Sequence, residues 1–171
     1  MKAYNTILVL FALFLVNTTT SYAQKYGHIN SGNLLEMMPE VQQANDSLMA
    51  LQKSLLSAGE QMVKAFEVKY RALEADVNAG NISQIDRQKR EDDLRKEQET
   101  IQQYETEMQS KLNMKREALL SPLLNKMKDA IQTVAKEGGY NMIFDESVGV
   151  LLFANQADDI TAAVKTKLNI K

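Results

Sequence analysis

A helical pattern of apolar residues begins after Pro39, and it is too long for a compact domain. One apolar residue recurs every three or four positions, as one face of a helix requires. The pattern comprises Val41, Ala44, Leu48, Leu51, Leu55, Ala58 and Met62, and it continues through Phe66, Tyr70, Leu73 and Val77. At about 1.5 Å per residue, a helix of roughly 40 residues measures about 60 Å. The sequence therefore predicts a projecting arm with a seam like that of a coiled coil.

A short polar segment separates this helix from a second one. Gly80 suits the left-handed conformation that ends a helix, and Ser83 suits the N-cap of the next helix. Asp86, three residues later, completes a start that resembles a capping box. Because a tight connection makes two long helices antiparallel neighbours, we predict a helical hairpin with its tip at about residues 78–83.

The returning helix begins with almost no apolar residues. From Asp86 to Glu99, eleven of fourteen residues are charged and Leu94 is the only apolar one. Such a helix is stable when it is largely solvated and supported by ion pairs four residues apart. The predicted pairs are Asp86 with Arg90, Glu91 with Arg95, and Asp92 with Lys96. An apolar stripe then resumes with Ile101, Met108, Leu112, Leu119, Leu123, Met127, Ile131 and Val134.

The two ends of the chain predict a small β region. Residues 26–30 have the composition of a short strand, and the apolar runs 140–145 and 150–154 predict a hairpin. A last helix is expected near residues 161–168, with Thr161 as its N-cap. Three short strands and one short helix are too few to close a core within one chain. Strands pooled from several subunits would bury Ile29, Ile143, Phe144, Leu151 and Phe153 together.

The N-terminus has the pattern of a signal peptide. Lys2 precedes an apolar run from Ile7 to Val16, and polar residues lead to the small-residue pattern that ends at Ala23. That run is too short to span a bilayer, and no comparable stretch follows it. We therefore predict cleavage near Ala23, export without stable membrane insertion, and a single mature chain over residues 24–171. The absence of Cys favours the bacterial periplasm over a disulfide-rich secreted domain.

Composition excludes several classes of function. The chain has 20 Lys and Arg against 22 Asp and Glu, so it lacks the positive charge of a nucleic-acid binder. With no Cys and with His28 as the only His, thiolate and histidine-rich metal sites are excluded. The chain contains no glycine motif that could hold a nucleotide phosphate, and the periplasm contains no ATP. We expect no enzymatic activity and no cofactor.

Several segments resemble one known family. They are Tyr26-Gly27-His28-Ile29-Asn30, Leu34-Leu35, Pro39-Glu40, Leu120-Ser121-Pro122-Leu123, Gly139-Tyr140-Asn141-Met142-Ile143-Phe144-Asp145, Val150-Leu151-Leu152-Phe153-Ala154 and Asp158-Asp159-Ile160-Thr161 with Val164 and Leu168. Over essentially the whole mature chain, this pattern resembles the Skp (OmpH-like) periplasmic chaperones of outer-membrane proteins. The resemblance implies an α+β, mainly α fold. It also implies a homotrimer with an intersubunit β-barrel body and three helical-hairpin arms around a cavity.

The resemblance also implies a function, an ATP-independent holdase that encloses unfolded outer-membrane proteins and prevents their aggregation. Residues 24–45 and 118–171 would form the oligomerisation body, and residues 46–117 would form the arm. Candidate client contacts on the arm are Met62, Phe66, Tyr70, Leu73, Val77, Ile82, Ile85, Leu94, Ile101, Tyr104 and Met108. Candidate body residues are Ile29, Ile143, Phe144, Leu151, Phe153, Val164 and Leu168. Each apolar arm residue has an alternative role, which is to hold the two helices of the hairpin together.

A second function stays open, that of a structural or adaptor coiled-coil protein of the cell envelope. Such a protein would need a continuous apolar seam, whereas only Leu94 interrupts the polar stretch between Ile85 and Ile101. The arm also departs from the better-known family members, which are strongly basic. Residues 60–115 carry 10 basic and 12 acidic groups, so no site for lipopolysaccharide or anionic membrane is assigned.

Overall fold

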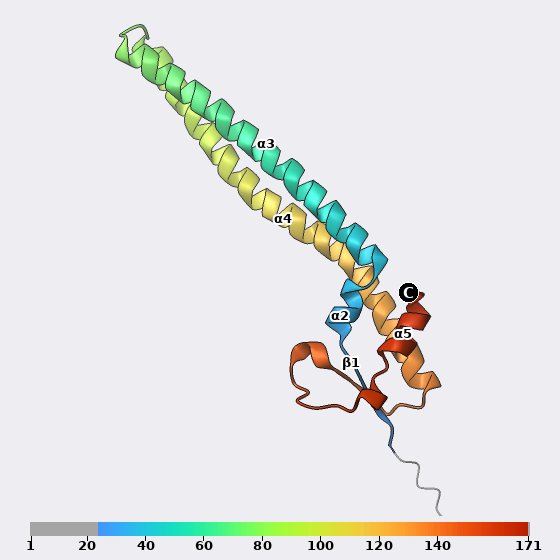
Figure 1. Ribbon diagram of the computed structural model, residues 1–171. Coiled ribbons are helices and arrows are strands. Elements are labelled where there is room, and N and C mark those ends of the chain that lie inside the picture. Colours follow the sequence, from blue (N-terminus) through green and yellow to red (C-terminus); the bar gives the residue numbers. More distant parts are fainter. Residues whose placement is uncertain (1–23, 171) are drawn as a thin grey trace, which may run out of the picture.

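The chain forms a long helical hairpin that projects from a small body (Figure 1). The computed structural model describes residues 24–170, so the predicted signal peptide lies outside the described residues. The hairpin consists of α3 (Pro39–Asn78) and α4 (Gln84–Glu137). The fold is mainly helical, as the sequence predicted, and both long helices begin and end within a few residues of the predicted positions.

The tip of the hairpin has the predicted local chemistry. Gly80 has a φ of 68°, in the left-handed region that glycine tolerates. Ser83 is the N-cap of α4, and its hydroxyl accepts a hydrogen bond from the Asp86 N–H at 3.1 Å. Five residues therefore suffice to reverse the chain between two helices that run side by side.

The ion pairs along the arm differ from the predicted ones. Arg90 Nη1 lies 2.7 Å from Asp76 Oδ2, so it joins α4 to α3. Lys69 pairs with Glu97 in the same way. Asp86 instead accepts a hydrogen bond from the Ser83 hydroxyl at 2.6 Å, which leaves Arg90 free to reach the other helix. The ion pairs within α4 are Arg87 with Glu91, Arg95 with Asp92 and Lys111 with Glu107, so all three predicted pairs are wrong.

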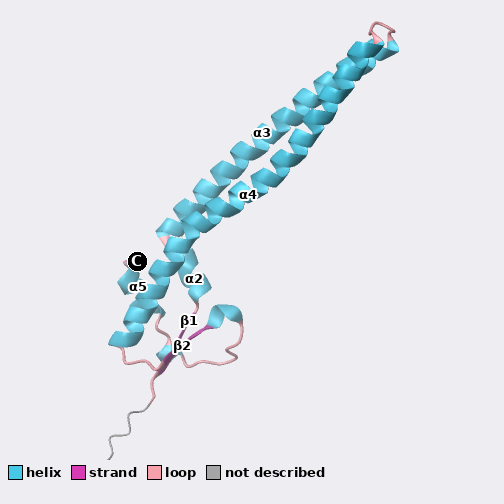
Figure 2. Cartoon of the chain, turned by 180° about the vertical axis from the view of Figure 1, so that it is seen from behind, coloured by secondary structure: helices cyan, strands magenta, loops and turns pink. Residues whose placement is uncertain are grey.

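Two strands form the sheet of the body. Strand β1 (Tyr26–Ile29) pairs in parallel with β2 (Met142–Asp145), with Tyr26 opposite Met142 and Ile29 opposite Asp145. Figure 2 shows both strands at the base, below the hairpin. The predicted β-hairpin is wrong for the described chain, because residues 150–154 form no strand there. The short 3-10 helix η1 (Glu146–Val148) follows β2 and ends at Gly149, and the chain continues as an open loop (Figure 1).

Two short helices complete the body. Helix α2 (Ser31–Glu36) was not predicted, and the Asn30 side chain caps it by accepting from the Asn33 N–H at 2.9 Å. Helix α5 (Thr161–Leu168) follows the 3-10 helix η2 (Gln156–Asp158) and has the predicted bounds. Thr161 is not its N-cap: Ile160 holds that position, and the Asp159 carboxylate accepts from the Thr161 N–H at 2.7 Å.

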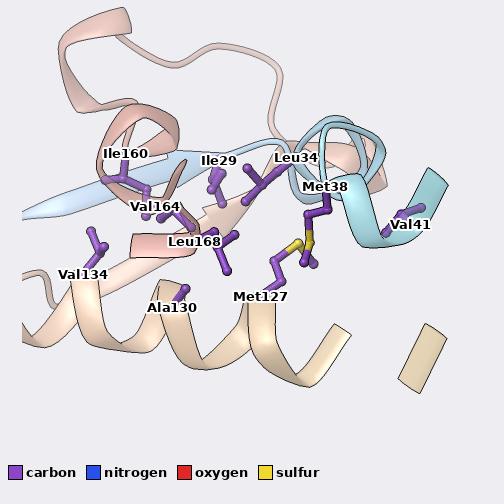
Figure 3. Close-up of a cluster of buried hydrophobic side chains, with 10 residues drawn as sticks. All are labelled: Ile29, Leu34, Met38, Val41, Met127, Ala130, Val134, Ile160, Val164 and Leu168. Atoms are coloured by element: carbon purple, nitrogen blue, oxygen red, sulfur yellow. The ribbon is translucent and has the colours of Figure 1, made fainter. Parts of the chain in front are cut away.

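One chain builds its own hydrophobic core, contrary to the expectation from its few strands. Figure 3 shows side chains from β1, α2, the start of α3, the end of α4 and α5 meeting at the base of the arm. The buried cluster comprises Ile29, Leu34, Met38, Val41, Met127, Ala130, Val134, Ile160, Val164 and Leu168. Because their apolar stripes continue into the body, the long helices supply four of these ten residues, and Met38 is the N-cap of α3.

Polar contacts fix the strand–helix junctions of the body. The Asp145 carboxylate accepts hydrogen bonds from the Ser31 N–H at 3.1 Å, the Ser31 hydroxyl at 2.5 Å and the Ser147 N–H at 2.9 Å. Partial burial alone would raise the pKa of Asp145, but the hydrogen bonds from Ser31 and Ser147 lower it below its ordinary value. The Asp145 carboxylate therefore joins β2 to the start of α2 in its charged form.

We predict that Asp145→Asn lowers the free energy of unfolding by about 1 to 3 kcal/mol at neutral pH, because the partly buried side chain loses its charge and one of its two accepting oxygens. The pKa of Asp145 is lower in the folded chain than in the unfolded chain. Its contribution to the free energy of unfolding is therefore complete above the pKa of the unfolded chain, and it disappears as the pH falls through the pKa of the folded chain. Urea denaturation at fixed protein concentration should show the wild-type advantage shrinking in acid. Asp158→Asn is the control, since the exposed Asp158 carboxylate accepts no hydrogen bond within residues 24–170. An advantage that is constant with pH would contradict this assignment.

Candidate functional site

Two open grooves run between α3 and α4 along the arm. The proximal groove has a volume of about 400 Å³, with Leu55, Leu56, Gly59 and Val63 on α3 facing Ile101, Tyr104 and Met108 on α4. The distal groove has a volume of about 390 Å³, with Phe66, Tyr70, Leu73 and Val77 on α3 facing Leu94 on α4. They follow one another because α3 and α4 are antiparallel and lie side by side over their whole common length (Figures 1 and 2).

Both grooves open on the same side of the hairpin. Leu56 and Val63 line the proximal groove, and Tyr70 and Val77 line the distal one. These four residues are spaced by seven, so they form a nearly straight line along one face of α3. We call this side of the hairpin the groove face. A further groove contains Ala72, which points about 160° away from Tyr70 around the helix, and it therefore lies on the opposite face.

Burial separates the predicted client contacts into three groups. Leu73 and Leu94 are buried between the helices, where they hold the hairpin together. Tyr70 and Ile85 are exposed, by 53% and 83%. The intermediate group is half-buried and consists of Met62, Phe66, Val77, Ile82, Ile101, Tyr104 and Met108. Of all eleven predicted client contacts, the two grooves bring together eight. Met62 lies outside both grooves, and Ile82 and Ile85 lie at the tip.

Aromatic contacts stiffen both grooves. The rings of Phe66 and Tyr70 stack in the distal groove, with centroids 6.3 Å apart and planes inclined by 22°. In the proximal groove, the Tyr104 hydroxyl crosses to α3 and donates a hydrogen bond to the Leu55 carbonyl oxygen at 2.8 Å. Gly59 lies under this ring: a Cβ there would be 3.3 Å from Tyr104 Cε1. Tyr104 can therefore lie across α3 because residue 59 has no side chain.

Sequence reasoning missed several exposed apolar residues of the groove face. Leu56 and Val63 line the proximal groove, and Met49 is exposed one heptad before Leu56. The predicted apolar pattern from residue 41 to 62 follows the side of α3 that packs on α4. Met49, Leu56 and Val63 lie beside that pattern on the helix surface. The sequence pattern that could have revealed them is a spacing of seven residues between Met49, Leu56, Val63 and Tyr70. This spacing indicates a second apolar stripe next to the seam.

The predicted body residues also differ in their burial. Ile29, Val164 and Leu168 are buried in the core, and Ile143 packs against it. Leu151 is half-buried, and Phe144 is exposed except for a tilted ring contact with Tyr26 at 6.3 Å. Phe153 is 85% exposed, and its neighbour Leu152, which the sequence reasoning did not single out, is 97% exposed. Together with Val148 and Val150 they form an exposed apolar loop on the body.

The single histidine of the chain has two polar neighbours in the body. His28 is a buried side chain of β1, with Nε2 2.9 Å from the Asn155 carbonyl oxygen and Nδ1 2.6 Å from Glu146 Oε1. The structure from residue 24 to 170 contains no cluster of three or more metal-ligating residues. In the same part of the chain, no helix is both long and apolar enough to cross a membrane.

Comparison with known proteins agrees with this architecture. The family model described as outer membrane protein (OmpH-like) matches residues 25–168. The chain belongs to the OmpH-like family. Members of this family are chaperones and not enzymes, as the sequence predicted for this chain.

Two relatives extend over nearly the whole OmpH-like chain. The chaperone protein Skp of Yersinia enterocolitica is 24% identical over 152 residues, which cover 89% of this chain and 90% of that protein. A crystal structure of an OmpH-like protein from Caulobacter crescentus has a TM-score of 0.75 and 18% identity, and the match covers 90% of this chain and 88% of that one. The second likeness shows that the two proteins share their fold.

We predict that Gly59→Ala stabilises this OmpH-like chain much less than the usual gain of about 1 kcal/mol for a helix interior. The new Cβ presses on the Tyr104 ring, 3.3 Å away, and weakens its hydrogen bond to Leu55. In a Tyr104→Ala background the obstacle is absent, so the full gain should return. Urea unfolding followed by circular dichroism measures both gains in a double-mutant cycle. Equal gains in the two backgrounds would contradict the packing role of Gly59.

Proposed function

We propose that the protein is an ATP-independent periplasmic holdase, which encloses unfolded outer-membrane proteins between helical arms and prevents their aggregation. The observation that carries this proposal is the groove face, where large apolar side chains stay open to solvent along most of the arm. A chaperone named Skp is among the relatives of the chain. The family model that matches this chain is described as outer membrane protein (OmpH-like), and it supports outer-membrane proteins as the clients.

The chemistry of the groove face suits weak binding of many sequences. The grooves are shallow and open, and their floors combine aliphatic, aromatic and methionine side chains. Such surfaces adapt to different partners without specifying one, because their contacts are nondirectional and Met is flexible. Several weak contacts on neighbouring arms would hold a client firmly in total while each one is released easily. Binding energy alone can drive this cycle, so no nucleotide is needed.

We further propose a homotrimer in which the body forms an intersubunit β-barrel. Leu152 and Phe153 are almost fully exposed in one chain, and contiguous exposed apolar residues of this kind mark protein interfaces. The two-stranded sheet has open edges, which further strands could cover. Residues 150–154 have the composition of a strand and would supply that pairing in the assembly. In this arrangement, residues 24–45 and 118–171 form the body and residues 46–117 form the arm.

The proposed place of action is the periplasm. The N-terminal 23 residues have the pattern of a secretory signal, with cleavage near Ala23. Export would bring the chaperone to the compartment through which outer-membrane proteins pass. A structural or adaptor role is the less favoured alternative, because the buried seam of the distal arm depends on few residues, Leu73 and Leu94 above all.

Light scattering of the mature protein tests the holdase proposal directly. A urea-unfolded outer-membrane β-barrel protein is diluted into buffer with and without the chain, and mass and turbidity are recorded together. We expect the chain to keep the client soluble at about one trimer per client, because the groove faces cover its apolar segments. A fixed oligomer that leaves the client aggregating would refute the holdase and favour the adaptor alternative.

A double variant of the exposed loop tests the proposed assembly. We expect Leu152→Asp with Phe153→Asp to shift the mass from trimer to monomer, since two charges would be buried in the interface. Val68→Asp is the matched control, because Val68 is also exposed but lies on the arm. Circular dichroism checks that both variants keep their helices. A double variant that remains a trimer would show that this loop does not form the interface.

A further inference from the structure

Negative charge is concentrated on one side of the arm. The rim of the two grooves carries five carboxylates, Glu60, Glu67, Glu74, Glu91 and Glu105. Only two basic residues, Lys64 and Arg95, line the same grooves. The apolar floor of the groove face is therefore bordered mainly by acidic side chains.

Most of this rim charge is not neutralised by ion pairs. Glu91 pairs with Arg87, and Glu67 has a loose contact of 3.7 Å with Arg71. In the described part of the chain, Glu60, Glu74 and Glu105 have no ion-pair partner. These three carboxylates can therefore receive cationic groups from a bound molecule.

The opposite face of the arm is balanced. Its groove contains Lys69 and Glu97, which pair with each other, and Arg90, which pairs with Asp76. The two remaining charges, Asp93 and Lys96, have opposite signs. The hairpin thus has an apolar, acidic face and an electrostatically neutral one, although its net charge is small.

The length of the groove face matches one particular kind of ligand. Its floor extends on α3 from Leu55 to Val77, which are 22 residues apart and therefore about 33 Å. An extended chain rises about 3.3 Å per residue, so about ten residues cover this distance. A strand that crosses the outer membrane has about 9–11 residues, with apolar side chains at alternate positions.

We propose that the groove face binds an extended segment of about ten residues, with apolar side chains at alternate positions and Lys or Arg between or beside them. The apolar side chains contact the floor, and the cations meet Glu60, Glu74 and Glu105 at the rim. This proposal rests on the proposed function and adds a client preference to it. Among the strands of an unfolded outer-membrane protein, those that carry basic residues are retained most strongly.

Two fluorescein-labelled decapeptides test the preference by fluorescence anisotropy with the full mature protein. Both alternate Leu or Val with a charged residue, which is Lys in one peptide and Glu in the other. We expect the Lys peptide to bind about tenfold more tightly at low ionic strength, since each of three exposed pairs contributes modestly. The difference should shrink as salt screens the charges. Equal affinities, a preference for the Glu peptide, or no binding of either would overturn the proposal.

A matched pair of triple variants separates the rim from the net charge. The rim variant is Glu60→Gln, Glu74→Gln and Glu105→Gln, and it should lose most of the preference for the Lys peptide. The control is Asp93→Asn, Glu99→Gln and Asp129→Asn, which changes the net charge equally with exposed residues that do not line the two grooves of the groove face. The control should keep the preference. An equal loss in both variants would show that net charge, and not the rim, selects the peptide.

The outcome is distinguishable from a failure of the proposed function. A chain that keeps an outer-membrane protein soluble but treats both peptides alike would overturn only the preference. A chain that prefers the Lys peptide through its rim but lets the client aggregate would overturn the holdase and leave a peptide-binding face. The solubility assay and the peptide assay therefore give independent answers.

Discussion

The arm depends on the packing of its two helices into one core at its base. Met38 and Val41 at the start of α3 meet Met127, Ala130 and Val134 near the end of α4, and β1 and α5 close the cluster. Helix α4 has 54 residues and therefore extends about 80 Å, so most of its length lies beyond this core. The core fixes the direction in which the hairpin leaves the body. Everything farther out depends on contacts between two helices alone.

This constraint divides the apolar residues of the arm between two tasks. Leu73 and Leu94 are buried because two helices without a third layer need some seam to stay together. The seam is narrow, and the cross-helix pairs of Lys69 and Arg90 supplement it with little energy because they are exposed. Side chains beside the seam, such as Tyr70, remain largely exposed in the described arm. A hairpin this long leaves apolar surface open along its length.

The long helices and the tip between them were predicted from local patterns, whereas the pairing of distant segments was not. Ser83 and Gly80 act within a few residues, so the tip could be predicted from its own chemistry. The parallel pairing of β1 with β2 joins segments 116 positions apart, and no local pattern distinguishes it from the hairpin that was expected. The core was underestimated for the same reason. The groove residues Leu56 and Val63 were missed because a search for one buried stripe passes over apolar side chains beside it.

Net charge does not describe how charge is distributed between the two faces of the arm. Acidic and basic residues nearly balance over positions 60–115, so the sequence assigned no site for an anionic partner there. Ion pairs, however, neutralise the two faces unequally. On the opposite face, Arg90 and Lys69 join the helices, whereas Glu60 and Glu105 at the grooves form no ion pair within residues 24–170. Because an exposed charge acts over about one Debye length of roughly 8 to 10 Å, a bound segment experiences the rim next to it and not the average of the arm. An arm of small net charge can therefore carry one charged face.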